Sequence, residues 1–473
     1  MNRLIIKQVC FIFVIALFSK MSLAAVTLED VKGSWLGTMN IPDGPSLRIG
    51  IEVFKKADNQ WGGNIASLDQ GARYMLVSSV NIKNDVFTLQ MANAPISVVG
   101  NVVKNQNFIA TKFHQGESVF ELNLQKVKEL PEIERSQTPK DTNDYIQQEV
   151  AYQNKHDGTW LSGTLTTPKG TKSHPGIVLV AGSGPNHRDS YHAGHRTFKV
   201  LADHFTRLGY VVLRSDKRGV YKSAGNFEDA SLSNLVLDTQ AAVRFLKSQN
   251  SVDANNIILV GHSEGSLVSI MAADKELVQG VVSLAGPGMS VLDILLLQDQ
   301  TEPKAKGATK EETDVLLQFS QRFYAMVLST PSAAERKEKA IALYDSLTGK
   351  EAETVAKWVN KQNGTLSIAS AESDSFYTFL QQNPIPYWNQ YAGKALVLNG
   401  SKDSQVPANE NVMGIVDAVN SDNADVESHI FTDLNHLFQP ATTGSTDEYR
   451  QIETTIDEQV LLVISKWLQQ NFK

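Results

Sequence analysis

From about residue 147 onward, the chain alternates short apolar runs with amphipathic stretches, and this alternation constrains the fold more than any other feature. Runs suited to strands buried on both faces are Gly176–Val180, Tyr210–Leu213, Ile257–Val260, Gly280–Ala285 and Ala395–Leu398. Between several of these runs, apolar side chains recur at helical spacing. Strands and helices that alternate in this way predict an α/β fold with a doubly wound, mostly parallel sheet.

The alternation is interrupted between about residues 288 and 390, where no convincing buried strand occurs. The amphipathic stretches of this region are Val291–Leu297, Glu311–Val327, Ala333–Leu347 and Glu351–Lys361. A helical insertion between two strands of a sheet is typical of a lid, so we expect a helical cap. The sheet then resumes, with a last strand at Glu427–Phe431 and a final helix from about Asp447 to Leu468.

The first part of the chain has a different pattern, in which short β-rich runs recur between Gly, Asn and Asp turns. These runs are Ser46–Phe54, Tyr74–Ile82, Val86–Met91, Ile96–Val103, Asn107–Phe113 and Val119–Val127. They predict a small antiparallel barrel or sandwich. A polar stretch rich in Glu, Pro and Lys follows and has the composition of a linker. We therefore expect a β-rich domain at 25–128, a linker at 129–146 and the α/β domain at 147–473, its cap at about 288–390.

The N-terminal residues have the layout of a secretory signal peptide. Arg3 and Lys7 precede the apolar run Val9–Phe18, and Ser22–Ala24 supplies small residues for cleavage. The run is shorter than the ~20 residues of a membrane span, although an uncleaved anchor helix is the alternative. We expect cleavage after residue 24, a periplasmic or secreted protein and no stable membrane insertion. Cys10, the only cysteine, would be lost, which excludes a thiol nucleophile or a cysteine-ligated metal.

The charge balance is acidic, with 44 Lys and Arg residues against 51 Asp and Glu residues. No basic stripe is present that could neutralise phosphates, so nucleic acid is not an expected partner. The sequence leaves the oligomeric state open.

Gly261-His262-Ser263-Glu264-Gly265 is a G-x-S-x-G pentapeptide between a buried strand and a plausible helix. The motif requires this strand–turn–helix setting, because the serine sits on a sharp turn that projects its hydroxyl above the sheet. Gly261 and Gly265 would avoid clashes with the neighbouring strand and helix. The pattern predicts that Ser263 is a catalytic nucleophile.

With these features, the chain from about residue 147 to 473 resembles the α/β-hydrolase superfamily, and in particular its esterase, dienelactone-hydrolase and prolyl-oligopeptidase-like branch. The residues that carry the resemblance are the pentapeptide, Val180–Pro185 after the first buried parallel strand, and Asp216–Gly219 after the next. The resemblance implies a serine hydrolase that needs no cofactor or metal. It also implies a catalytic acid and a histidine that follow the nucleophile in that order.

The acid and the base implied by this resemblance are Asp403 and His436. Asp403 follows the buried strand Ala395–Leu398, where the family keeps its acid, and His436 lies in the loop after the last strand. Asp422 and Asp425 are rival acids, but they fall in a polar stretch before that strand. His429 is a rival base, but it lies within the strand itself.

The oxyanion loop implied by the resemblance is Gly182-Ser183-Gly184-Pro185. Small residues let backbone amides approach an oxyanion closely, and one such donor is worth ~3 kcal/mol in the transition state. The expected donors are the amides of Glu264 and Ser183, with Gly184 as the alternative second donor. The family begins this loop with His-Gly, whereas this chain has Ala181-Gly182, which leaves the second donor open.

Three histidines, His187, His192 and His195, follow this loop. Their spacing is not that of a helical metal site, so we interpret them as pocket-mouth or surface residues, with a metal site as the alternative. Arg188 and Asp189 are interpreted as a structural ion pair.

Three functions remain open at this stage. The leading interpretation is hydrolysis of a small-molecule carboxylic ester through a Ser-His-Asp triad and an acyl-enzyme. A serine aminopeptidase, amidase or thioesterase would use the same triad. A non-catalytic binding protein on a hydrolase scaffold is the alternative from a different class.

Overall fold

The computed structural model describes residues 25–92, 94–140, 143–273, 278–359, 368–420 and 425–472. The expected signal peptide, the end of the expected helix at Lys361 and the rival acid Asp422 lie outside these residues. Within the described ranges, no helix has both the length and the apolar character required to cross a membrane.

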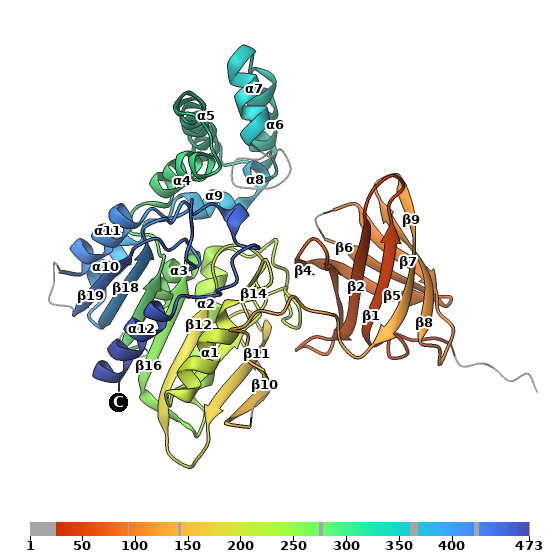
Figure 1. The fold of residues 1–473 in the computed structure, drawn as a ribbon, viewed down its shortest axis with the longest axis horizontal. Helices are drawn as coiled ribbons and strands as arrows, with labels where there is room; N and C mark the ends of the chain where they lie inside the picture. The colour runs from red at the N-terminus through yellow and green to blue at the C-terminus, as the bar shows by residue number, and fades with distance from the viewer. Residues whose placement is uncertain are drawn as a thin grey trace, which may run out of the picture.

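The N-terminal residues fold into a sheet whose strands are all antiparallel, shown in red to orange in Figure 1. Within the described residues its strands are β1 (Gly33–Asn40), β2 (Ser46–Lys55), β3 (Trp61–Ser67), β4 (Ala72–Met75), β5 (Val77–Lys83), β6 (Val86–Met91), β7 (Ile96–Asn101), β8 (Phe108–Gln115) and β9 (Ser118–Val127). The sheet curls, so that β3 packs beside β5, and the buried face of each strand fills one apolar core. The antiparallel all-β prediction is confirmed. We call this unit the N-terminal sheet.

The second sheet has the spatial order β10-β11-β15-β12-β16-β17-β18-β19. Its strands are β10 (Tyr145–Gln153), β11 (Trp160–Pro168), β12 (His174–Val180), β15 (Val211–Ser215), β16 (Val252–His262), β17 (Gly280–Leu284), β18 (Lys394–Gly400) and β19 (Val426–Phe431). All neighbours from β15 to β19 pair in parallel, and β11 pairs antiparallel with both β10 and β15. The predicted mostly parallel sheet is confirmed.

Helices cover both faces of this sheet (Figure 1). One face carries α1 (Thr197–Arg207) and α12 (Glu458–Asn471), which pack against each other and on the sheet. The other face carries α2 (Leu232–Lys247), α3 (Glu264–Ala272), α10 (Ile385–Gln390) and α11 (Ala408–Asn420). The central strands are therefore buried on both sides, which explains why their sequences are continuously apolar.

The segment between β17 and β18 is helical, as the sequence predicts. It contains α4 (Val291–Ala305), α5 (Lys310–Ser329), α6 (Ala333–Asp345), α7 (Gly349–Trp358), α8 (Ile368–Glu372), α9 (Asp374–Leu380) and α10. In Figure 1, α5, α6 and α7 stand above the sheet, while α4 and α9 lie closer to it. We call α4 to α9 the helical insertion.

Three expectations about individual elements are wrong. The run Tyr74–Ile82 is two strands, because the chain leaves the ladder at Leu76 between β4 and β5. The helix expected from Asp447 begins only at Glu458, where the side chain of Asp457 caps the helix by accepting the Gln459 amide at 2.9 Å. Two short strands that were not expected, β13 (Tyr191–His192) and β14 (His195–Arg196), form a small hairpin.

A buried carboxyl group in the helical insertion makes stability depend on pH. Asp299 on α4 accepts a hydrogen bond from the Tyr324 hydroxyl of α5 at 2.6 Å, and burial raises the pKa of Asp299 to about 7. Between pH 4 and 7 the unfolded chain releases this proton and the folded chain keeps it, so stability falls as pH rises through that window.

We therefore expect Asp299→Asn to raise the melting temperature by several degrees at pH 8 and by much less at pH 5. Asparagine keeps an oxygen for Tyr324 and cannot ionise. Thermal unfolding at both pH values, followed by circular dichroism, measures the effect. Asp314→Asn on α5 is the matched control, because Asp314 is exposed. An equal shift at pH 5 and pH 8 would contradict the prediction.

Candidate active site

A cavity of about 210 Å³ lies at the carboxyl ends of the parallel strands, where open α/β sheets bind their ligands. Its polar wall contains Ser183, His192, Ser263, Glu264, Gln298, Gln405, His436 and Tyr449. Its apolar wall contains Leu267, Pro287, Val291, Ile294, Leu295, Phe379, Val406 and Leu437. Because several of the apolar residues belong to α4 and α9, the helical insertion forms part of the wall.

Ser263 occupies a strained turn between β16 and α3. Its backbone has φ 56° and ψ −126°, a left-handed conformation that non-glycine residues seldom adopt. The glycines on either side are required, since a Cβ on Gly261 would lie 2.3 Å from the Gly265 oxygen, and a Cβ on Gly265 would lie 2.1 Å from the Val180 oxygen. The turn places Ser263 at the N-terminus of α3, where developing negative charge is stabilised.

His436 and Asp403 are hydrogen-bonded to each other beside this turn. The distance from His436 Nδ1 to Asp403 Oδ2 is 2.7 Å, and both side chains are almost completely buried. Because a carboxylate can only accept, Nδ1 carries the proton and Nε2 is free to act as a base. His436 and Ser263 line the same cavity.

Backbone contacts hold Asp403 and His436 in place. The second carboxylate oxygen of Asp403 accepts the amides of Gln405 at 2.9 Å and Val406 at 2.8 Å. The carbonyl oxygen of His436 is 2.9 Å from Nε2 of His262, the residue just before Ser263. Burial and the nearby His436 lower the pKa of His262 to about 3, so its ring is neutral and Nε2 can donate this bond.

The rival residues lie elsewhere. Asp425 is exposed and pairs with Lys394 at 3.0 Å. His429 is an exposed residue of β19. Neither of them lines the cavity.

The loop Gly182–Gly184 approaches Ser263 directly. A Cβ on Gly182 would lie 3.1 Å from Cβ of Ser263, and Gly184 has φ 86°. The Ser183 hydroxyl donates to Glu264 Oε2 at 3.1 Å, and Lys217 Nζ donates to Glu264 Oε1 at 3.0 Å. These contacts bring Ser183 and Glu264, two of the expected oxyanion donors, to the same side of the cavity.

Asn186 holds this loop, and the sequence interpretation did not identify it. Its side-chain amide nitrogen lies 2.9 Å from the carbonyl oxygen of Gly182, 2.8 Å from that of Ser183 and 3.2 Å from that of Gly184. Its position directly after Gly182–Pro185 was the available signal. The interpretation also missed Gln405 and Tyr449, which are hydrogen-bonded to each other at 2.6 Å in the cavity wall.

We expect Asn186→Ala to lower kcat on an ester substrate by about 10- to 100-fold with a smaller change in KM. Displacing an oxyanion donor weakens an interaction made chiefly in the transition state, and full removal of one costs ~10²–10³-fold. Steady-state kinetics measure the change. Asn226→Ala, at an exposed asparagine, is the control, and a normal kcat for Asn186→Ala would contradict the prediction.

The three histidines after the loop occupy different places. His187 is buried against Tyr74 of the N-terminal sheet, with ring centroids 3.8 Å apart. His192 lines the cavity, where burial lowers its pKa to about 4 and keeps its ring neutral. His195 bonds the Thr455 hydroxyl and the Tyr449 carbonyl oxygen, each at 2.9 Å. Across the described residues, no group of three or more His, Cys, Asp or Glu side chains has metal-binding geometry.

Arg188 and Asp189 both form buried ion pairs, but not with each other. Arg188 pairs with Asp216 at 2.6 Å, and Asp189 pairs with Arg214 at 2.8 Å and Arg196 at 2.6 Å. The structural interpretation of these residues is consistent with this network, while the direct pairing is wrong because their side chains diverge.

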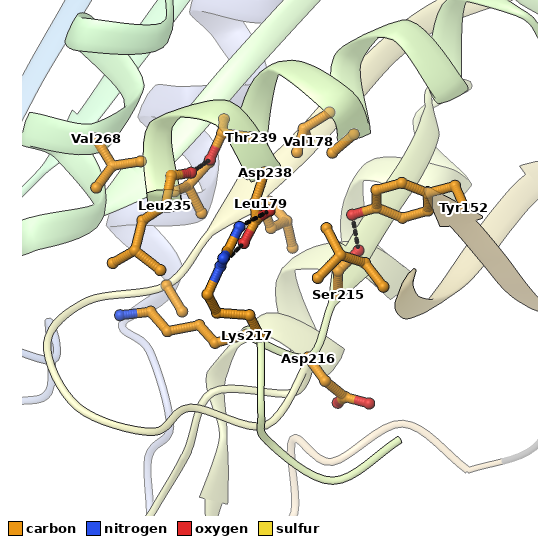
Figure 2. Close-up of a pocket in the computed structure, with 15 residues that line it drawn as sticks. Tyr152, Val178, Leu179, Ser215, Asp216, Lys217, Leu235, Asp238, Thr239 and Val268 are labelled. Atoms are coloured by element: carbon orange, nitrogen blue, oxygen red, sulfur yellow. Dashed lines mark hydrogen bonds and ion pairs between the residues drawn. The ribbon is translucent and has the colours of Figure 1, made fainter. Parts of the chain in front are cut away.

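A second cavity, of about 60 Å³, lies between α2 and the sheet (Figure 2). None of the residues around it is Ser263, Asp403 or His436. Its polar groups bind one another: Arg218 pairs with Asp238 at 2.7 Å, and the Tyr152 hydroxyl donates to Ser215 at 2.9 Å.

The chain is similar to known hydrolases. The family model described as serine aminopeptidase, S33, matches residues 187–346, which include Ser263. Esterase EstD of Thermotoga maritima is 23% identical over 325 residues, 69% of each chain. A Pyrococcus furiosus esterase structure is 15% identical and covers 72% of this chain and 97% of its own, with a TM-score of 0.42. Est1E of Butyrivibrio proteoclasticus, solved with ferulic acid, is 15% identical and covers 68% and 98%, with a TM-score of 0.41.

Three independent features therefore coincide in residues 145–472. They are a mostly parallel sheet with an antiparallel second strand, a serine on a strained strand-to-helix turn, and similarity to serine hydrolases in sequence. In its sheet order, its strained serine turn and its sequence similarity, the chain resembles the α/β-hydrolase superfamily.

Proposed function

We propose that this protein hydrolyses small carboxylic esters, with Ser263 as nucleophile, His436 as general base and Asp403 as the acid that orients it. The observation that carries the proposal is the shared cavity: Ser263, on its strained turn, lines the same space as His436, whose Nδ1 is fixed by Asp403. The similarity to EstD, an esterase, supports the choice of ester substrates.

In this mechanism the Ser263 hydroxyl attacks the ester carbonyl carbon, and Nε2 of His436 accepts the hydroxyl proton. The Glu264 and Ser183 amides, with Gly184 as the alternative to Ser183, stabilise the oxyanion of the tetrahedral intermediate. His436 then protonates the alcohol as it leaves, and an acyl group remains on Ser263. Water, deprotonated by His436, attacks this acyl-enzyme and releases the acid.

We also propose that the helical insertion acts as a cap over the substrate. Val291, Ile294 and Leu295 of α4 and Phe379 of α9 supply apolar surface to the cavity. A volume of about 210 Å³ exceeds the 150 Å³ of an engineered cavity that holds benzene, so the site suits small substrates. The layout of residues 1–24 supports export to the periplasm or the medium as part of the same proposal.

The second candidate is a serine aminopeptidase, which the description of the matching family favours. An aminopeptidase must bind the positive amino terminus of its substrate. Glu264 is the one carboxylate among the residues that line the described cavity, and Lys217 already pairs with it at 3.0 Å. The described cavity therefore offers little negative charge to bind a positive amino terminus, and this favours neutral esters over peptides as substrates.

The test is a comparison of kcat/KM for short p-nitrophenyl esters and aminoacyl p-nitroanilides on the purified protein. We expect the esters to be preferred by several orders of magnitude, with a burst of p-nitrophenol equal to the active enzyme as the acyl-enzyme forms. Preference for the anilides would establish the aminopeptidase instead. A folded protein inactive on both would favour a binding function.

A further inference from the structure

The N-terminal sheet contributes no side chain to the catalytic cavity, yet it contacts the segment that forms one wall of it. This segment runs from Gly182 to Arg196 and contains the oxyanion loop, Asn186, and the β13–β14 hairpin with His192. We call it the oxyanion segment. Apart from the two-residue strands of its hairpin, it has no regular secondary structure, so its shape depends on a few backbone turns and on side-chain contacts.

The principal contact is a stack of two rings. Tyr74 of β4 lies parallel to His187, with ring centroids 3.8 Å apart and an interplanar angle of 4°. His187 directly follows Asn186, which binds the carbonyl oxygens of Gly182 to Gly184. The ring that Tyr74 contacts is therefore only one residue from Asn186, whose side chain binds the oxyanion loop.

Other aromatic rings enclose this stack. Tyr74 meets Tyr191 at 5.8 Å and Tyr221 at 5.3 Å, both edge-on, and Phe54 of the N-terminal sheet packs on Tyr221 at 4.7 Å. Tyr191 is the neighbour of His192 in the cavity wall. Burial lowers the pKa of His187 to about 4, so its ring is neutral at physiological pH and packs as an aromatic group.

Tyr74 adopts a strained backbone to make this contact. Its φ is 56°, a left-handed value that is strained for a bulky residue. Such strain persists only where surrounding contacts stabilise it, and here those contacts are the rings across the interface and the Arg196 guanidinium. The strained residue is thus the one whose ring stacks on His187 of the oxyanion segment.

The residues that follow the N-terminal sheet hold the other end of the segment. The Ile133 side chain lies against Gly194 in the turn of the β13–β14 hairpin, and Arg135 Nη2 donates to the Ala193 carbonyl at 3.4 Å. Glu132 pairs with Arg196 at the end of the hairpin. Tyr74 and residues 132–135, which lie outside the second sheet, thus contact the oxyanion segment at His187 and at the β13–β14 hairpin.

From these contacts we infer that the N-terminal sheet and residues 132–135 position the oxyanion segment, with Tyr74 as the positioning residue that acts through His187 and Asn186. The expected loss of kcat rests on the proposed esterase function, whereas the expected change in hydrogen exchange of residues 182–196 does not. It assigns the N-terminal sheet a role in rate rather than in substrate contact.

The test compares Tyr74→Ala, Tyr74→Gly and Tyr74→Phe in the full chain. Glycine removes the ring and also relieves the left-handed strain, so it separates loss of the stack from misfolding of β4. We expect the alanine and glycine variants to lose about tenfold in kcat on a p-nitrophenyl ester, with KM within about twofold. Phenylalanine keeps the stack and should retain kcat within about twofold.

Two readouts distinguish positioning from general destabilisation. Hydrogen exchange should quicken in residues 182–196 in the alanine and glycine variants, and not in β15–β19. The rate of fluorophosphonate labelling should fall with kcat, because that reaction also develops charge in the oxyanion hole. Arg450→Ala is the control, since it removes a bond to the Asp69 carbonyl oxygen that joins the two units away from the stack.

Unchanged exchange in 182–196 after loss of the Tyr74 ring would overturn the inference, as would an equal loss of kcat in Arg450→Ala. If the wild type neither hydrolyses esters nor reacts with fluorophosphonate, the proposed function fails. Local exchange in 182–196 would still decide whether Tyr74 positions the segment.

Discussion

Ser263→Ala is expected to abolish ester hydrolysis, with a fall in kcat of about 10⁴-fold or more, and to abolish covalent labelling by a fluorophosphonate probe. The reason is chemical, because alanine has no oxygen to attack the carbonyl carbon or the phosphorus atom. The fold should be retained, since the Ser263 amide that donates to the Leu284 carbonyl at 2.8 Å is unaffected.

Labelling followed on a fluorescent gel, together with p-nitrophenyl acetate kinetics, measures both consequences. Ser248→Ala is the matched control, because Ser248 is exposed beyond the end of α2 and away from the cavity. Substantial activity in Ser263→Ala at normal stability would show that another residue is the nucleophile, and the proposed mechanism would be wrong.

Asp403→Asn is expected to lower kcat by about 10⁴-fold while leaving the fold intact. The asparagine oxygen would keep the bonds from the Gln405 and Val406 amides, so its NH₂ group would face His436. Because NH₂ can only donate, Nδ1 of His436 would have to become the acceptor. The proton would then reside on Nε2, and the imidazole could no longer accept the serine proton.

The pH–rate profile and kcat of Asp403→Asn on a p-nitrophenyl ester test this, with the thermal midpoint as the check on folding. Asp433→Asn is a close control: Asp433 lies in the loop before His436, but it is exposed and pairs with Lys402 at 2.8 Å. Activity of Asp403→Asn within tenfold of wild type would exclude Asp403 as the orienting acid and reopen the choice among nearby carboxylates.

The features that the sequence determined by itself are those encoded in a short stretch of chain. The buried strands are continuous apolar runs because helices cover both faces of the sheet. Such runs can be recognised in the sequence alone. The G-x-S-x-G turn is likewise local, because its two glycines are demanded by backbone atoms of adjacent elements. The antiparallel N-terminal sheet was predicted from the spacing of its turns, although the break between β4 and β5 at Leu76 was not.

Only the tertiary structure decided which distant residues meet. His436 and Asp403 are 33 residues apart in the chain, and their 2.7 Å contact depends on the pairing of β18 with β19 and the loops beyond them. The resemblance to a family suggested both residues, whereas no local pattern selects them. The contacts of Asn186, Tyr449 and Tyr74 depend on partners that only the fold brings close. Local propensity fixes strands and turns, but packing between remote segments fixes the site.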